Sequence, residues 1–391
     1  MRFPRTLDSV ALARAKELPI VAVLGPRQAG KSTLCASLFA HKPLVSLEAH
    51  EARESALRDP VGFLARFPAG AVLDEAQRAP ALFSELQIDA DRSPEPGRWI
   101  LTGSQHFSML SSISQSLAGR VSLLTLLPLS LEELGAARAA EPESAAWIGG
   151  YPRIHDRGLD PVAWLDDYVT TYVERDVRQV LNVGDLGAFQ TFLGLCAGRA
   201  GQLLNLTNLG TEAGVTNKTA KAWISVLEAS FVVFQLRPYF RNVNKRLTKS
   251  TKLYFHDVGL LCRLLGVWTA EQLAVHPLRG AIFENLVVSE LVKARLHRGR
   301  RSDLCFYRDQ SGREVDVLVD DPLDPVLIEI KATRTPLADT ARSLDEVASV
   351  LQGAEIRPRS VRRVLVYAGA EASTSAGVER VPWHAASGIL T

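Results

Sequence analysis

Residues 25 to 33 combine two glycines, a lysine and two hydroxyl side chains at a spacing that suits a polyphosphate ligand. They read Gly25-Pro26-Arg27-Gln28-Ala29-Gly30-Lys31-Ser32-Thr33 and fit the pattern GxxxxGK[ST] in full. The glycines permit a curled loop whose backbone N–H groups point at phosphate oxygens. Lys31 then reaches the β- and γ-phosphates, Ser32 offers its hydroxyl to Mg²⁺, and Thr33 helps to cap the next helix. We interpret the loop as a site for ATP or ADP with Mg²⁺, rather than as a glycine-rich turn without a ligand.

Two acids follow the short apolar run at residues 71–73, and they complete the chemistry that ATP hydrolysis needs. Asp74 would hold Mg²⁺ through water, and Glu75 would orient and deprotonate the attacking water. The alternative is that Asp74 and Glu75 are simply two exposed acids after a strand, a common pattern when no other motif accompanies it. Their position downstream of a full phosphate loop favours the functional interpretation.

Small polar residues also follow the apolar run at 99–101. The tip of this strand is expected beside Asp74, at the crevice of an open parallel sheet. Thr102, Ser104 or Gln105 could then touch the γ-phosphate or the attacking water, with Ser104 and Gln105 preferred. The alternative is a turn that ends the strand and caps the next helix.

Arg120 stands just before the apolar run at 121–127. An arginine at this point can reach the γ-phosphate held by a neighbouring subunit and stabilise charge in the transition state. Local sequence allows a second interpretation equally well, in which Arg120 complements the negative end of the preceding helix.

Three acids and a lysine recur near the C-terminus: Glu284, Asp316, Glu329 and Lys331. Glu329 and Lys331 are two apart on one expected strand, so their side chains share a face. Asp316 and Glu329 could hold Mg²⁺, Lys331 could activate water, and Glu284 could complete the set. This arrangement resembles the PD-(D/E)xK nuclease superfamily, although an inactive fold used for binding, or plain ion pairing between strands, explains the same residues.

The stretch at 206–224 reads as helix, tight turn and helix, with Gly214 at the turn and Thr216 as the cap of the second helix. Strands like those of a winged helix follow at 231–240. The basic candidates for contact with DNA phosphates are Lys218, Lys221, Lys245 and Arg246. A module used for packing or subunit contact is the alternative.

The elements that position these residues divide the chain into three expected parts. Residues 1–135 alternate apolar runs with helical stretches, which predicts a parallel sheet of the P-loop NTPase type sandwiched between helices. Residues 136–275 are expected to form a helical lid and winged-helix region. Residues 276–391 are expected to form a smaller nuclease-like α/β domain.

Composition agrees with a globular protein: 47% of the 391 residues are hydrophobic and 23% are charged. Lys and Arg number 45 and Asp and Glu number 43, a balance that neither demands nor excludes nucleic acid. The 4 cysteines lie without close spacing, which disfavours a zinc site and suits a reducing compartment. No apolar run is long enough for a signal peptide or a membrane span, so we expect a cytoplasmic protein without membrane contact.

Several strings, in order, make the chain similar to a known family. They are the phosphate loop, DEAQ from Asp74, LTGSQ from Leu101, SLAGRV from Ser116, GGYP from Gly149, KLYFHDVGL from Lys252 and GAIFEN from Gly280. The resemblance is to bacterial and archaeal AAA-type ATPases with a C-terminal domain called DUF4143. It implies an AAA+-like core that works as a homo-oligomer. A ring, such as a hexamer, is one form that this oligomer could take. The resemblance also implies that Arg120 is the arginine finger, because that is where AAA+ proteins carry it.

From these features we expect an oligomeric motor or switch that acts on DNA and is driven by ATP hydrolysis. One alternative is an ATP-gated, Mg²⁺-dependent nuclease in repair or defence. The other is a nucleotide-dependent regulatory or scaffold protein that does not process DNA.

Overall fold

The computed structural model describes residues 3–104, 117–135, 141–173, 185–239, 250–336, 338–353 and 358–390. The apolar runs near the N-terminus form parallel strands, as predicted: β1 (Ile20–Leu24), β2 (Leu44–Ser46), β3 (Val72–Asp74), β4 (Trp99–Gly103) and β5 (Val121–Thr125). Within the described residues they lie side by side in the order β2-β3-β4-β1-β5. The carboxyl ends of all these strands therefore meet at one edge.

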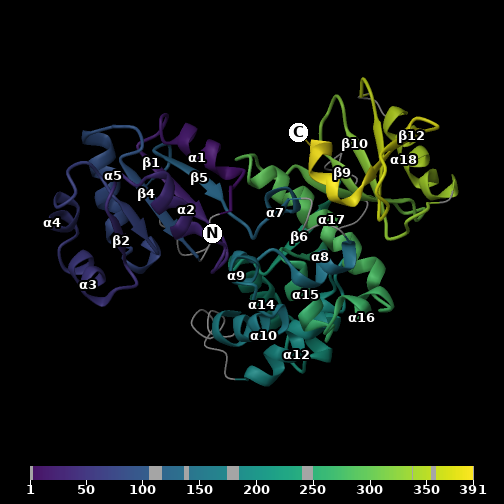
Figure 1. Cartoon of the computed structure of the whole chain (residues 1–391), viewed down its shortest axis with the longest axis horizontal. Helices are drawn as coiled ribbons and strands as arrows, with labels where there is room; N and C mark the ends of the chain where they lie inside the picture. Colours follow the sequence, from purple (N-terminus) through teal and green to yellow (C-terminus); the bar gives the residue numbers. More distant parts are fainter. Residues whose placement is uncertain are drawn as a thin grey trace.

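Helices cover both faces of this sheet, which lies on the left in Figure 1. Ile20, Ala22 and Leu24 of β1 pack into one apolar cluster, whereas Val21 and Val23 pack into another. Burial on both faces explains why β1 is apolar at every position. The helical elements of this part are α1 (Leu7–Arg14), α2 (Lys31–Leu38), α3 (His50–Arg58), α4 (Pro60–Ala65), the 3₁₀ turn η1 (Ala76–Arg78), α5 (Leu82–Arg92) and α7 (Leu131–Leu134).

The middle of the chain is mostly helical, as its periodicity predicts. Capping explains several boundaries: Asp160, Asn205 and Thr216 each accept a hydrogen bond from a free N–H of the helix that follows. The elements are α8 (Pro142–Ile148), α9 (Pro152–Arg157), α10 (Pro161–Tyr168), the π-helical turn η3 (Val169–Val173), α12 (Leu186–Ala197), α13 (Leu206–Glu212), α14 (Asn217–Ala229), α15 (Val258–Leu264) and α16 (Ala270–Ala274).

A second sheet joins the middle of the chain to its C-terminal part. In the described residues its order is β12-β13-β11-β10-β9-β8-β6-β7. Its strands are β6 (Val233–Pro238), β7 (Lys252–Phe255), β8 (Leu304–Arg308), β9 (Glu314–Val319), β10 (Val326–Lys331), β11 (Arg362–Tyr367), β12 (Ser373–Ser375) and β13 (Val378–Pro382). The helical elements of the C-terminal part are α17 (Arg279–Leu296), η4 (Ala338–Ala341), α18 (Arg342–Gln352) and η5 (Trp383–Leu390).

β6 and β7 form an antiparallel pair, and β6 also runs parallel to β8. The N–H of Tyr239, just after β6, donates to the carbonyl of Phe306 in β8 at 2.7 Å. β8 thus supplies a hydrogen-bond partner for the backbone at this end of β6. The sheet thus continues across the boundary at residue 275 that the sequence suggested.

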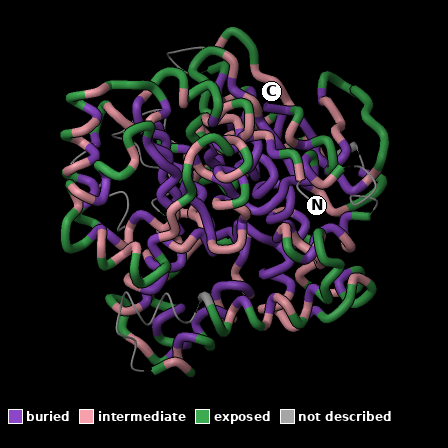
Figure 2. The backbone as a smooth tube through the Cα atoms, turned by 60° about the vertical axis from the view of Figure 1, so that its left-hand side comes forward, coloured by how far each residue is buried: buried purple, intermediate pink, exposed green. Residues whose placement is uncertain are grey.

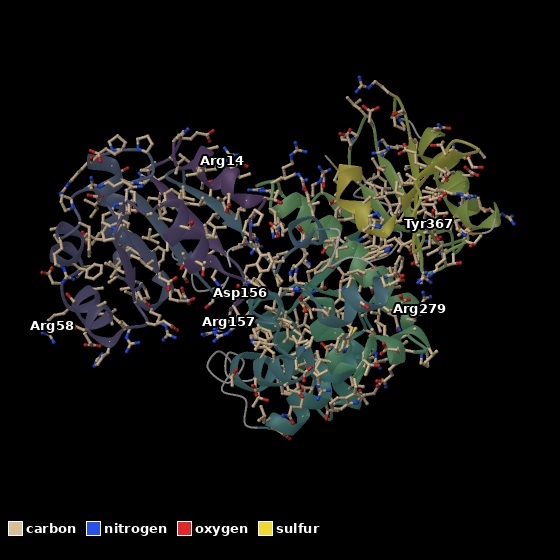
Figure 3. The ribbon with its side chains drawn as sticks, in the orientation of Figure 1. Arg14, Arg58, Asp156, Arg157, Arg279 and Tyr367 are labelled. Carbon is tan, nitrogen blue, oxygen red and sulfur yellow. The ribbon has the colours of Figure 1, made fainter. Side chains whose placement is uncertain are left out.

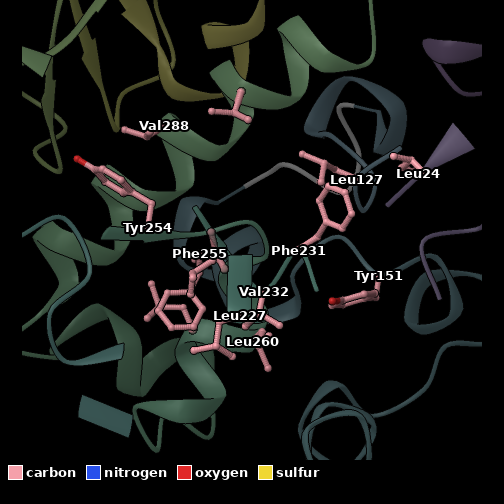
Figure 4. Packing of buried hydrophobic residues seen from close by; sticks show 14 of the residues in the cluster. Leu24, Leu127, Tyr151, Leu227, Phe231, Val232, Tyr254, Phe255, Leu260 and Val288 are labelled. Atoms are coloured by element: carbon pink, nitrogen blue, oxygen red, sulfur yellow. The ribbon is translucent and has the colours of Figure 1, made fainter. Parts of the chain in front are cut away.

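One apolar cluster runs through all three parts of the chain. Figure 4 shows side chains from each part in it, among them Leu24, Leu127, Tyr151 and Val288. Figure 2 shows the buried segments gathered inside, with exposed ones on the outer turns. Among the described residues, no helix combines the length and apolar character needed to cross a bilayer.

Candidate functional site

The phosphate loop lies between β1 and α2 at the carboxyl edge of the first sheet. Gly25 has φ 154° and Gly30 has φ 93°, angles that favour glycine. A Cβ on Gly25 would stand 2.0 Å from the carbonyl oxygen of Leu126. Position 25 therefore needs glycine for two reasons. The backbone angle favours glycine, and the backbone of Leu126, just after β5, leaves no room for a side chain.

Lys31 begins α2 and is 4% exposed. Its Nζ donates hydrogen bonds to the carbonyls of Gly25 at 3.0 Å and Pro26 at 2.8 Å, so the amine lies under the curled loop. Burial lowers the pKa of Lys31 although Glu75 and Asp74 attract its charge. Phosphate oxygens at the loop would offer this buried cation the strong anionic partners that the loop carbonyls do not.

Asp74 ends β3 beside two hydroxyl groups from other elements. Ser32 Oγ donates to Asp74 Oδ1 at 2.6 Å, and Thr102 Oγ1 donates to the same oxygen at 2.5 Å. The sheet register brings this about, because β3 and β4 pair through Leu73 and Leu101, one residue before Asp74 and Thr102. A hydroxyl and a carboxylate side by side are the oxygen ligands that Mg²⁺ takes, so this corner fits the ion.

Glu75 has φ 55°, an uncommon angle for a residue other than glycine. Ser104 Oγ donates to Glu75 Oε2 at 2.7 Å, and Gln77 Nε2 donates to the same oxygen at 2.5 Å. Burial opposes ionisation, but the Lys31 ammonium and these two hydrogen bonds outweigh it and hold the pKa of Glu75 below its ordinary value. Glu75 is therefore a fixed carboxylate that can accept a proton.

Two of the three polar residues expected after the apolar run at 99–101 reach this network. Ser104 contacts Glu75, and Thr102 contacts both Asp74 and the N–H of Glu75 at 3.2 Å. Gln105 lies outside the described residues. The sequence analysis did not single out Gln77; its position two residues after Glu75, in the string DEAQ, was the available signal.

A cleft of about 540 Å³ opens over the loop. Its wall includes Arg153, Asp156 and Arg157 of α9, together with Phe3 and Arg5 from the N-terminus. Figure 3 shows Asp156 and Arg157 on the side of the helical middle that faces the first sheet. The sequence analysis used GGYP, directly before Arg153, only as one of the strings that carry the family resemblance, so it missed this cationic wall.

Arg120 lies at the other end of the sheet. Its carbonyl accepts a hydrogen bond from the N–H of Ile20, the first residue of β1, whereas the phosphate loop follows the last. Five residues of strand put about 15 Å between them. The side chain is paired with Asp91, at 2.5 Å and 2.9 Å, and is 32% exposed. Arg120 therefore does not enter the cleft of its own chain.

The four C-terminal candidates come together between α17, β9 and β10. Burial raises the pKa of Glu284 and of Glu329 to about 7, and the charge of Asp316 adds to the effect. Lys331 Nζ contacts Glu329 Oε1 at 2.5 Å, and the N–H of Ile330 donates to Asp316 Oδ2 at 2.8 Å. The structure therefore brings Glu284, Asp316, Glu329 and Lys331 close to one another.

Lys252 of β7 enters this group, and the sequence analysis did not assign it a role. Its Nζ lies 2.7 Å from Glu314, 3.5 Å from Glu284 and 3.9 Å from Asp316, and Tyr254 donates to Glu284 at 2.6 Å. No trio of acids, histidines or cysteines among the described residues is arranged to hold a metal. Two lysines, Lys252 and Lys331, therefore lie among the expected Mg²⁺ ligands.

The helix–turn–helix prediction matches α13 and α14. Gly214 has φ 70° at the turn, and Thr216 Oγ1 accepts from the N–H of Thr219 at 3.1 Å. Lys218 and Lys221 are exposed on α14. Lys245 and Arg246 lie outside the described residues.

Comparisons with known proteins place the chain among its relatives. Residues 17–135 match the family described as AAA domain, and residues 279–385 match the domain of unknown function DUF4143. Residues 141–271 match a further domain of unknown function, DUF8612. The uncharacterized proteins Rv2008c of Mycobacterium tuberculosis and Mb2031c of Mycobacterium bovis are each 32% identical over 363 residues, which cover 92% of this chain and 78% of theirs.

Solved structures are similar at lower identity. The Walker-type ATPase of Pyrococcus abyssi is 14% identical with a TM-score of 0.46, over 67% of this chain and 96% of that one. A variant of RuvB from Thermotoga maritima is 20% identical with a TM-score of 0.30, over 58% of this chain and 87% of that one.

Proposed function

Because this chain belongs to the AAA-type P-loop ATPases that carry a C-terminal DUF4143 domain, we propose that it hydrolyses the ATP that it binds. The observation that carries the proposal is the Glu75 carboxylate, held by Ser104 and Gln77 beside the corner of Ser32 and Asp74. A base, an oxygen pair for a cation and a buried lysine at one edge of a sheet are the parts that phosphoryl transfer to water needs.

Each residue has one task in this mechanism. The loop amides and Lys31 bind the phosphates, and Ser32 and Asp74 would hold Mg²⁺. When bound, Mg²⁺ supplies positive charge against the charge that develops on the phosphates. Glu75 orients the attacking water and accepts its proton, and Ser104 keeps the carboxylate aimed.

The direct test is a measurement of ATP turnover by the full chain with and without Mg²⁺. Phosphate release that requires Mg²⁺ and is lost in Glu75→Gln supports the proposal. Equal turnover by Glu75→Gln and the wild type would overturn the assignment of the base.

We further propose that the working form is a homo-oligomer in which Arg120 serves a neighbour's site. Its support is the position of Arg120, exposed at the far edge of its own sheet and held by Asp91, itself a surface residue. An arginine so placed lies away from the phosphate loop of its own chain, as expected of a residue that serves a neighbouring subunit.

The output proposed is an action on DNA. Its support is the helix–turn–helix of α13 and α14 with Lys218 and Lys221 exposed on the second helix, followed by the β6–β7 hairpin in the order of a winged helix. Phosphate contacts by such lysines would carry affinity without base readout. Measurement of ATP turnover with single-stranded, duplex and branched DNA tests this, and stimulation by any of them supports it.

Between the two alternatives, the C-terminal cluster favours a nucleotide-dependent regulator over a nuclease. Lys252 balances Glu284, Glu314 and Asp316 where Mg²⁺ would have to act. Mg²⁺-dependent nicking of DNA that is lost in Lys331→Ala would reverse this preference. Partner binding that follows the nucleotide state, without nicking, would support it.

A further inference from the structure

Arg5 reaches the phosphate loop from outside the motif. Its Nη1 donates to the carbonyl of Ala29 at 2.9 Å, and its Nη2 donates to the carbonyl of Leu127 at 2.6 Å. The side chain is 5% exposed. One guanidinium therefore ties the loop after β1 to the segment after β5, which is the kind of two-point contact that its planar fork allows.

The carbonyl that Arg5 holds matters for phosphate binding. The carbonyl of Ala29 and the N–H of Gly30 belong to one planar peptide group, so fixing one fixes the direction of the other. Gly30 directly precedes Lys31. A loop whose peptide planes are fixed before the ligand arrives loses less conformational entropy on binding.

Glu133 holds Arg5 in turn. Glu133 Oε2 lies 3.1 Å from Arg5 Nε, and Oε1 accepts from the N–H of Thr6 at 2.8 Å. The carboxylate is 2% exposed, so the two buried charges depend on each other. Removal of either one would leave the other without this opposite charge.

His297, just after α17, closes the chain of contacts from the C-terminal part. The N–H of Leu127 donates to His297 Nε2 at 3.1 Å, so the ring proton lies on Nδ1, which faces Glu133 Oε1 at 3.3 Å. Within α17 itself, the carboxylate of Glu290 accepts a hydrogen bond from the N–H of Leu131 at 2.7 Å. Lys293 donates to the carbonyl of Leu129 at 3.1 Å. α17 thus holds the segment that follows β5 at several points.

We infer that Arg5 is a positioning residue for the phosphate loop, and that Glu133 and His297 act on the loop through Arg5. Helix α17 of the C-terminal part, which His297 follows, thereby contributes to nucleotide affinity. The inference rests on nucleotide binding at the loop. It connects the two candidate sites physically, because α17 also carries Glu284. A change of nucleotide at the loop and a change at the C-terminal cluster would each be felt through the same helix.

The experiment measures the Kd of a fluorescent ADP analogue for full-length variants that melt as folded proteins. Arg5→Ala is expected to weaken binding about 10-fold or more, the scale of a charged hydrogen bond. The Kd of Arg5→Lys is expected to lie between those of the wild type and Arg5→Ala, because an ammonium keeps the charge but lacks the fork that spans both carbonyls. His297→Ala is expected to weaken binding too, although it touches no loop residue.

A double-mutant cycle separates this path from general damage. If Arg5 and His297 act together, Arg5→Ala/His297→Ala binds no more weakly than Arg5→Ala alone. Losses that multiply would overturn the inference. Arg295→Ala is the matched control, since Arg295 lies on α17 and pairs with Asp303 at 2.8 Å, away from the segment after β5. If Arg295→Ala weakened nucleotide binding as much as His297→Ala does, the inference would also be overturned.

The pair Arg5→Met/Glu133→Gln covers the case in which Arg5→Ala fails to fold, because it leaves no lone buried charge. Weak binding by this folded pair supports the inference, and wild-type affinity would end it. Failure of the proposed function is a separate result: the wild type itself would then bind nucleotide without hydrolysing it, and the Kd comparison would still decide the role of Arg5.

Discussion

The hydroxyl of Ser32 lies 2.6 Å from Oδ1 of Asp74, although 42 positions separate the two residues in the chain. Ser32 comes from the first turn of α2, and Asp74 ends β3. The sheet order brings them together, because β4 lies between β1 and β3 and all these strands point the same way. The candidate ATP site is thus a product of the parallel topology as much as of the motif.

Removal of the buried lysine should weaken nucleotide binding. Lys31→Ala is expected to cost about 2–3 kcal/mol, or roughly 30–150-fold in Kd, because a charged hydrogen-bond donor to phosphate is lost. Titration with ATP measures this. Lys42→Ala is a suitable control, since Lys42 donates to the carbonyl of Ala69 on the exposed surface. Unchanged affinity in Lys31→Ala would show that the loop does not hold phosphate.

Glu75→Gln should separate binding from turnover. ATP affinity is expected to stay within a few-fold, while turnover falls about 10²–10⁴-fold because the amide cannot accept the proton. Glu95→Gln is the control, since Glu95 pairs with Arg98 at 3.1 Å outside the residues that line the cleft. Wild-type turnover in Glu75→Gln would eliminate Glu75 as the base.

The same carboxylate predicts the acid limb of the pH profile. Its pKa is held below the ordinary value of 4.5, so the reactive ionised form persists down to that region and is lost as the pH falls through the lowered pKa. Between pH 5 and pH 8, protonation of Glu75 should therefore cause no fall in the rate of ATP turnover. A limb near neutral pH that disappears in Glu75→Asp, a variant that keeps a carboxylate, would contradict this assignment.

The C-terminal acids predict a pH dependence of opposite sign. The pKa values of Glu284 and Glu329 are raised to about 7 in the fold, against 4.5 for the ordinary group. The folded chain therefore binds more protons than the unfolded one between these values, and stability falls as the pH rises from about 5 to about 7. The melting temperature measured across this range should fall less in Glu284→Gln. A variant with the full wild-type slope would show that Glu284 is not the group that titrates.

Complementation between subunits should reveal the role of Arg120. Arg120→Ala and Lys31→Ala are each expected to lose most turnover alone, the first by a factor of about 10³ if the finger acts in trans. In mixed oligomers, an intact phosphate loop from one variant can meet an intact Arg120 from the other, so part of the activity should return. Mixtures no more active than the sum of the separate variants would refute the trans role.

Phosphate contacts by α14 should appear as a change in salt dependence. Lys218→Ala/Lys221→Ala is expected to weaken DNA binding for all sequences alike and to reduce the slope of log affinity against log salt by about 1–2. Fluorescence anisotropy with labelled duplexes of two unrelated sequences measures both effects. A slope equal to that of the wild type would remove these lysines from the interface.

The sequence by itself determined the phosphate loop, the strand that leads to it and the two acids that follow the apolar run at 71–73. Those features depend on local patterns: an apolar run marks a buried strand, and glycine spacing marks a loop that must curl. The sequence also suggested the group of Glu284, Asp316, Glu329 and Lys331. Asp316, Glu329 and Lys331 lie on strands that pair, so strand patterns could suggest that they meet, whereas Glu284 comes from helix α17.

Only the tertiary structure decided which distant residues complete these sites. Lys252 enters the C-terminal cluster because β6 joins β8 and so brings β7 to the same sheet. Arg5 meets Ala29, Leu127 and Glu133, which lie far from it in the chain and come together only in the fold. Such contacts depend on which surfaces of separate elements are buried against each other, and no spacing within one segment of the chain records that choice.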